Sequence, residues 1–157
     1  MLERVAKTLR RSLLEDDALF AVLVLDIDGF KLYNASLGWA AGSELLCAVG
    51  DRLSQNLRPT DVVGSLGANQ FCILLQRISH RAEATLVSQR IIDFLGEPIE
   101  VAGTEVSISI RIGIAIYEPA YTVADHMIAD AEAASLRAKT DAGSSLQICE
   151  ATLDEGN

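Results

Sequence analysis

The chain has 157 residues, half of them hydrophobic, so it can bury a core and is expected to form a single globular domain. Its 13 basic and 22 acidic side chains give a net charge of −9, which disfavours binding to a nucleic-acid backbone or direct contact with an anionic membrane. The longest purely apolar run, Leu19 to Leu25, is far shorter than the roughly 20 residues that span a bilayer, and no signal peptide is evident. We therefore expect a cytoplasmic domain.

The cysteines and histidines do not predict a metal site. Cys47, Cys72 and Cys149 are an odd number, form no C-x-x-C pair and lie in apolar segments, which predicts reduced thiols in the core. His80 and His126 have no second histidine or cysteine at the spacing of metal ligands. Zinc is not expected.

Hydrophobic periodicity predicts the first half of the chain. Residues 2–14 place apolar side chains at helical spacing among charges, which indicates an amphipathic helix leading into the domain. The apolar run at 19–27 is typical of a strand buried on both faces. A short helix is predicted at 30–37, and a longer one runs from about 42 to 57, where Pro59 stops it.

A hairpin and a helix come next. Strands at 62–66 and 71–75 flank a segment rich in glycine and amide side chains, which is typical of a β-hairpin. Ser79 is the expected cap of a helix that ends at Gly96, ahead of Pro98.

The last part of the chain returns to sheet. Strict alternation from Val106 to Ile116 predicts one strand with one face towards the core. Thr122 and Asp125 fit a capping box for a helix that continues to about Thr140, and residues 146–149 are a predicted edge strand. The element order indicates an α+β, ferredoxin-like sandwich in which helices cover one face of an antiparallel sheet.

Three fragments, in order and at matching spacing, point to one family. The first is L-D-I-D-G-F-K at 25–31, followed by Asn34, the second is A-G-S-E-L-L at 41–46, and the third is S-L-G-A-N-Q-F at 65–71. Together they resemble the GGDEF family of diguanylate cyclases. The resemblance implies a nucleotidyl-cyclase-type sheet flanked by helices, and it runs over about residues 19–139.

The resemblance also sets the expected boundaries of the domain. Residues 1–17 are expected to form an N-terminal linker helix, residues 18–150 a degenerate GGDEF domain, and residues 151–157 a disordered tail. The sequences of the second and third fragments look most like those of GGDEF domains that precede an EAL phosphodiesterase domain in one polypeptide.

The family's metal site is incomplete in this chain. A diguanylate cyclase joins two GTP molecules with the help of divalent ions, which require carboxylate ligands. The resemblance assigns metal binding to Asp26, to the Ile27 carbonyl and to a hairpin glutamate, which is Gln70 here. The hairpin itself, Gly67, Ala68, Asn69, Gln70 and Phe71, departs from G-G-D-E-F, and Ala68 brings a Cβ to a position where the family's second glycine lets the backbone approach phosphate.

The implied nucleotide site has also lost groups. The family's guanine-binding aspartate is Ser43, whereas the second guanine contact is retained as Asn34. Lys139 matches a phosphate-contacting lysine, but the arginine expected shortly after it is absent. Each lost donor or charge commonly costs about a hundredfold in rate, so we expect no cyclase activity and no required cofactor. Weak Mg²⁺ binding and a merely solvated strand end at Asp26 and Asp28 are left as equal alternatives.

One site retains the family pattern. Arg58 and Asp61 form the R-x-x-D motif at the spacing of the family's product-binding inhibitory site. An arginine fork can bond guanine or phosphate while the aspartate accepts from guanine N–H groups. The alternative, given equal weight, is an arginine that complements the helix end and an aspartate that closes a turn. Trp39, at the mouth of the implied cleft, is expected to plug it rather than stack on a base.

Three functions follow from these residues. The first is a regulatory module that senses cyclic-di-GMP at Arg58 and Asp61 or transmits contacts through the helix at 2–14. The second is a GTP-binding allosteric domain that controls an attached EAL phosphodiesterase. The third is a homodimerisation scaffold that binds no ligand.

Overall fold

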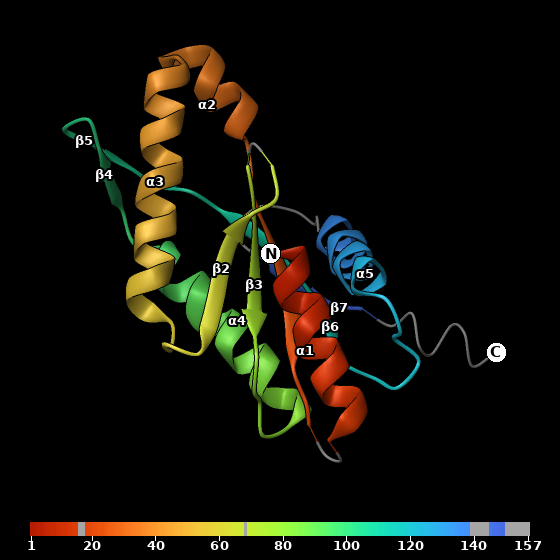
Figure 1. The fold of residues 1–157 in the computed structure, drawn as a ribbon. Helices are drawn as coiled ribbons and strands as arrows, with labels where there is room; N and C mark the ends of the chain where they lie inside the picture. Colours follow the sequence, from red (N-terminus) through yellow and green to blue (C-terminus); the bar gives the residue numbers. More distant parts are fainter. Residues whose placement is uncertain (16–17, 68, 139–144, 150–157) are drawn as a thin grey trace.

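The computed structural model describes residues 1–15, 18–67, 69–138 and 145–149, and it folds as a five-stranded sheet between two layers of helices (Figure 1). The elements, in chain order, are α1 (Leu2–Leu14), β1 (Ala21–Ile27), α2 (Phe30–Leu37), α3 (Trp39–Asn56), β2 (Asp61–Ser65), β3 (Gln70–Leu75), α4 (Arg81–Leu95), β4 (Ile99–Val101), β5 (Thr104–Val106), β6 (Ile110–Ile116), α5 (Ala124–Arg137) and β7 (Ser145–Ile148). No helix in these ranges is long and apolar enough to cross a membrane.

The α+β class is confirmed, but the sheet is mixed rather than wholly antiparallel. Its strand order is β2-β3-β1-β6-β7, and β1 lies at the centre, antiparallel to both β3 and β6. The edge strand β7 was expected, and it pairs parallel with β6 because the chain crosses over through α5 between the two strands.

Helices cover both faces of the sheet, so the expectation of one covered face was wrong. One core lies between the sheet and α3 and α4, and it takes Leu23 and Leu25 from β1. The other lies between the sheet and α1 and α5, and it takes Val22 and Val24. Figure 1 shows these helices on opposite sides of the strands. The physical reason is that β1 is buried at every position and apolar at every position except Asp26, and a strand with two apolar faces needs cover on both.

The strand predicted from Val106 to Ile116 is two strands. Residues 107–109 lie outside any strand, β6 begins at Ile110, and β5 pairs with β4 in a separate two-stranded hairpin that the sequence analysis missed. The turn of that hairpin holds Ala102 and Gly103 at φ of 52° and 80°, the left-handed backbone of a tight hairpin turn. The alternation of side chains continues through the break, so periodicity alone could not reveal it.

The predicted helix starts also need correction. The helix expected from about residue 42 begins at Trp39. The residue that precedes α4 is His80 rather than Ser79, and the Glu83 side chain accepts a hydrogen bond of 2.8 Å from the Ser79 backbone N–H. The capping box expected at Thr122 and Asp125 is absent, because α5 follows Val123 without a side-chain cap.

The cysteines differ in exposure. Cys72 is buried in β3, as predicted, and burial raises the pKa of its thiol to about 12. Cys149 is half-buried. Cys47 is exposed on α3, so its predicted place in the core was wrong, because it lies off the helix face that carries Leu45 and Val49.

We predict that thiol reagents distinguish these residues. In the native protein at neutral pH, Cys72 should react at least about 100-fold more slowly than Cys47, because it is protonated and reached only after the sheet opens. Timed alkylation followed by peptide mass spectrometry measures both rates in one sample. Unfolding in urea should make the two rates alike, and equal rates in the native protein would contradict the burial of Cys72.

Candidate functional site

Three polar residues lie in a row across the end of the sheet. Asp26 of β1 pairs in register with Gln70 of β3 on one side and with Arg111 of β6 on the other. Directly paired residues on neighbouring strands present their side chains on the same face. Here that face lies under α5, whose Ser135 hydroxyl donates a hydrogen bond of 2.8 Å to Asp26 Oδ2. Asp26 is only 4% exposed, so the reading of this residue as a solvated strand end is wrong.

Gly113 explains why α5 lies so close to the strands. A Cβ on this residue would overlap the backbone of Ala131 and Ser135 in α5. The helix backbone therefore rests directly on β6, two residues along the strand from Arg111. This close approach brings the Ser135 hydroxyl within hydrogen-bonding distance of Asp26.

Asn69 closes the end of β1. Its side-chain Nδ2 donates to the Ile27 carbonyl at 3.2 Å, and its backbone carbonyl accepts from the Ile27 N–H at the same distance. The Ile27 carbonyl was the second predicted metal ligand. In this structure its oxygen already accepts a hydrogen bond from the hairpin.

Asp28, just beyond β1, forms an ion pair with Arg111. The distance between Arg111 Nε and Asp28 Oδ1 is 2.7 Å, and the two side chains are 15% and 33% exposed. A contact this short is typical of a charge-assisted hydrogen bond. Arg111 was not among the predicted site residues, although an arginine between the isoleucines of a strand was a visible signal.

These donors do not fit a divalent metal. Mg²⁺ prefers several oxygen ligands with full negative charge near it. Here Asp26 Oδ2 accepts a hydrogen bond from Ser135, and the Ile27 carbonyl accepts one from Asn69. The side chain of Gln70 is neutral. Within the described ranges, no cluster of three or more His, Cys, Asp or Glu side chains could hold a metal ion.

The predicted nucleotide residues are only partly brought together. Asn34 of α2 lies against Gly42 of α3, so closely that a Cβ on Gly42 would overlap the Asn34 side chain. Asn34 Oδ1 is buried and has no hydrogen-bond partner among the described residues. Ser43 is the next residue of α3 and is exposed. Lys139 and Ala68 lie outside the described residues.

A pocket of about 360 Å³ lies at the end of β1, next to α2. Its lining includes Asp28, Tyr33 and Leu45, together with the segment 107–109 that links β5 to β6. Trp39 does not line this pocket and is 78% exposed, so the prediction that it plugs a cleft was wrong. Trp39 is the first residue of α3, and the buried residues of that helix begin only at Gly42.

The R-x-x-D residues are bonded to each other. Arg58 Nε and Nη2 donate to the two carboxylate oxygens of Asp61 at 3.4 and 3.3 Å, and the Arg58 backbone N–H donates to Asp61 Oδ2 at 3.0 Å. The Asp61 side chain is 2% exposed, whereas that of Arg58 is 44% exposed. The guanidinium is therefore held in place with one side open to solvent.

Two further groups complete this cluster. Arg58 Nη1 donates to Glu83 Oε2 of α4 at 3.0 Å, and Nη2 donates to the Arg77 carbonyl at 3.2 Å. Asp61, chiefly through its hydrogen bond, and Glu83 raise the pKa of Arg58. The Ser79 N–H and Arg58 lower the pKa of Glu83. Glu83 was not predicted, because its contact with Arg58 joins positions far apart in the sequence.

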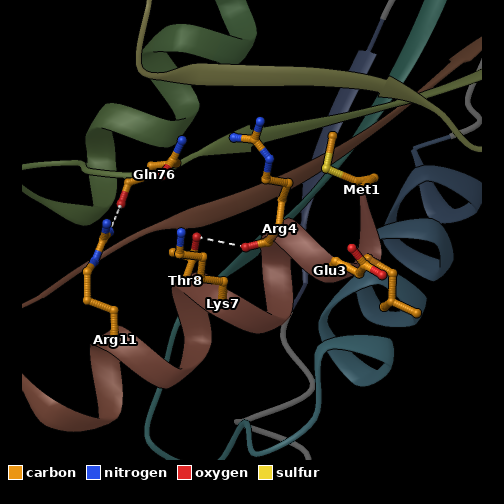
Figure 2. A pocket seen from close by; sticks show the side chains of 8 residues that line it. Met1, Glu3, Arg4, Lys7, Thr8, Arg11 and Gln76 are labelled. Carbon is orange, nitrogen blue, oxygen red and sulfur yellow. Dashed lines mark hydrogen bonds between the residues drawn. The ribbon is translucent and has the colours of Figure 1, made fainter.

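Hydrogen bonds connect α1 to the R-x-x-D turn. Arg11 Nη2 donates to the Gln76 carbonyl at 2.8 Å, as Figure 2 shows, and Gln76 Nε2 donates to the Thr60 carbonyl at 2.9 Å. Thr60 lies between Arg58 and Asp61. Arg11 and Gln76 also line a pocket of about 1140 Å³ along α1.

Comparisons with known proteins agree on one family. The family model "Diguanylate cyclase, GGDEF domain" matches residues 1–145. Diguanylate cyclase TpbB of Pseudomonas aeruginosa is 36% identical over 131 residues, which are 83% of this chain and 30% of TpbB. The bifunctional diguanylate cyclase/cyclic di-GMP phosphodiesterase MucR of the same species is 31% identical over 137 residues, 87% of this chain and 20% of MucR.

A solved structure matches closely as well. The crystal structure of the GGDEF domain of TpbB (YfiN) superposes with a TM-score of 0.87 at 35% identity, covering 94% of this chain and 92% of that one. The chain thus spans less than a third of the length of the two curated relatives but nearly the whole of the isolated domain.

Proposed function

Because the chain belongs to the diguanylate cyclase GGDEF domain family, we propose that it is a member without cyclase activity that regulates a larger cyclic-di-GMP signalling protein. The observation that carries this proposal is the residue opposite Asp26. The in-register position on β3 holds the neutral amide of Gln70, where the chemistry of the family calls for a second carboxylate. A site with one carboxylate holds a divalent ion poorly, and several lost groups together leave little catalysis.

The ligand that we propose for this module is cyclic-di-GMP, bound at Arg58 and Asp61. The two side chains leave one turn and are already aligned, so binding costs little ordering of the arginine. A ligand phosphate or guanine edge can replace Glu83 on the guanidinium while Asp61 continues to hold it.

This proposal predicts a specific loss of binding. Calorimetric titration of cyclic-di-GMP should show micromolar or tighter binding to the native domain, and Arg58→Ala should weaken it at least about 30-fold. Arg81→Ala is the matched control, since Arg81 lies on α4 and pairs with Glu118 instead. Absence of binding to the native domain would make the R-x-x-D turn purely structural.

We propose that α1 carries the signal to or from the rest of the protein. The support is the path from Arg11 through Gln76 to Thr60, which joins α1 to the ligand turn by two hydrogen bonds. Buried Val5 and Leu9 hold α1 against the sheet, so a displacement of the turn can change how this helix is held.

GTP sensing is the second candidate. It is favoured by Asn34, whose buried carbonyl oxygen lacks a partner in the described part of the chain. In this case the domain would control an EAL phosphodiesterase in the same polypeptide, an arrangement suggested by the bifunctional relative MucR. Thermal unfolding with GTP and Mg²⁺, compared with cyclic-di-GMP, separates the candidates. If neither nucleotide raises the unfolding temperature, the dimerisation scaffold is the remaining candidate function.

A further inference from the structure

We propose that Arg111 is a built-in counter-ion that takes the place of a metal at the end of β1. This inference rests on the proposed loss of cyclase activity and names the residue that keeps metal out. Restoring the missing hairpin carboxylate at Gln70 is therefore not enough to recover a metal site. Arg111 must lose its charge as well.

Strand register brings Arg111 to this position. Asp26 lies directly opposite Arg111, and the N–H of Asp28 donates to the Ser109 carbonyl at 3.0 Å, so the segment after β1 and the segment before β6 remain paired beyond the end of β1. Asp28 is then the diagonal neighbour of Arg111, within reach of a long side chain. The 2.7 Å contact between Arg111 Nε and Asp28 Oδ1 fills that diagonal.

The charge of Arg111 is permanent and poorly screened. A guanidinium stays protonated in proteins, and that of Arg111 is 15% exposed, so water weakens its field little. A divalent cation bound by Asp26 would lie beside this positive group and would repel it. It would also compete with Arg111 for the carboxylate of Asp28, two residues further along the chain.

The rest of the site is consistent with an internal cation. Asp26 Oδ2 accepts a hydrogen bond from Ser135, and the Ile27 carbonyl accepts one from Asn69, so these two oxygens have partners from the protein itself. Arg111 supplies one positive charge beside the two aspartates, in an ion pair with Asp28, so the three side chains together carry a net charge of −1 rather than −2. Because the net negative charge of this strand end is halved, it attracts a divalent cation less strongly than two unpaired aspartates would.

The test uses Mn²⁺ as the probe, with affinity measured by electron paramagnetic resonance and calorimetry. Four proteins are compared: the native domain, Gln70→Glu, and Gln70→Glu combined with Arg111→Gln or with Arg111→Lys. We expect Gln70→Glu alone to bind Mn²⁺ weakly, and Arg111→Gln to strengthen that binding about tenfold or more. The variant with Arg111→Lys keeps the charge and should remain weak.

The outcomes separate this inference from the proposed function. Mn²⁺ binding to Gln70→Glu that equals binding to the Arg111→Gln double variant would overturn the role of Arg111, and so would tight binding to the Arg111→Lys double variant. Circular dichroism checks that each variant folds, and Arg111→Ser is a second neutral replacement if Arg111→Gln does not. The proposed loss of cyclase activity fails separately, if the native domain converts GTP to cyclic-di-GMP.

Discussion

Given GTP and Mg²⁺, the domain is expected to form cyclic-di-GMP about ten-thousand-fold more slowly than the diguanylate cyclase TpbB, which is 36% identical to it. The reason is the number of groups missing from one site. Gln70 removes a carboxylate opposite Asp26, and Ser43 offers a hydroxyl where a guanine edge needs a pair of acceptors. Each loss of a preorganised charge or donor is expected to cost about a hundredfold or more.

The assay compares both proteins at equal concentration, with product measured by mass spectrometry over many hours. TpbB serves as the positive control that shows that the conditions support turnover. Product from this domain at a rate within about a hundredfold of TpbB would contradict the proposal, because it would require the site to work without its second carboxylate.

Gly113→Ala is expected to lower the free energy of unfolding by about 3 kcal/mol. The added Cβ would overlap the backbone of Ala131 and Ser135, and a helix backbone cannot rotate away as a flexible side chain can. The helix α5 must therefore move off β6. That movement opens the second core and separates the Ser135 hydroxyl from Asp26. Urea unfolding followed by circular dichroism measures the change.

Gly67→Ala is the matched control for this measurement. A Cβ on Gly67 has no heavy atom within 4 Å, and the residue does not have positive φ, so its replacement should change stability by less than about 0.5 kcal/mol. If Gly113→Ala were equally mild, α5 could not rest on β6 as closely as described.

Much of the candidate site could be predicted because its residues belong to short, ordered fragments. Asp26, Gln70, Arg58 and Asp61 each lie at the strand end or turn to which the family resemblance assigned them. The pairing of Asp26 with Gln70 followed from recognising two strands that meet. The sequence did not predict that Ser135 bonds to Asp26 or that Arg111 pairs with Asp28, because Ser135 and Arg111 come from distant segments with no motif of their own.

What the sequence determined by itself was local: the buried strand β1, the hairpin of β2 and β3, the family, and the neutral side chain of Gln70 in that hairpin. Tertiary structure alone decided which faces are covered, where the strand from Val106 breaks, and that Arg111 pairs with Asp28. The physical reason is that periodicity fixes which way a side chain points relative to its own strand, whereas register and close approach depend on segments far along the chain. Gly113 illustrates the difference. The sequence shows a glycine in a strand, but only the packing of α5 on β6 shows that a larger residue would overlap the helix backbone.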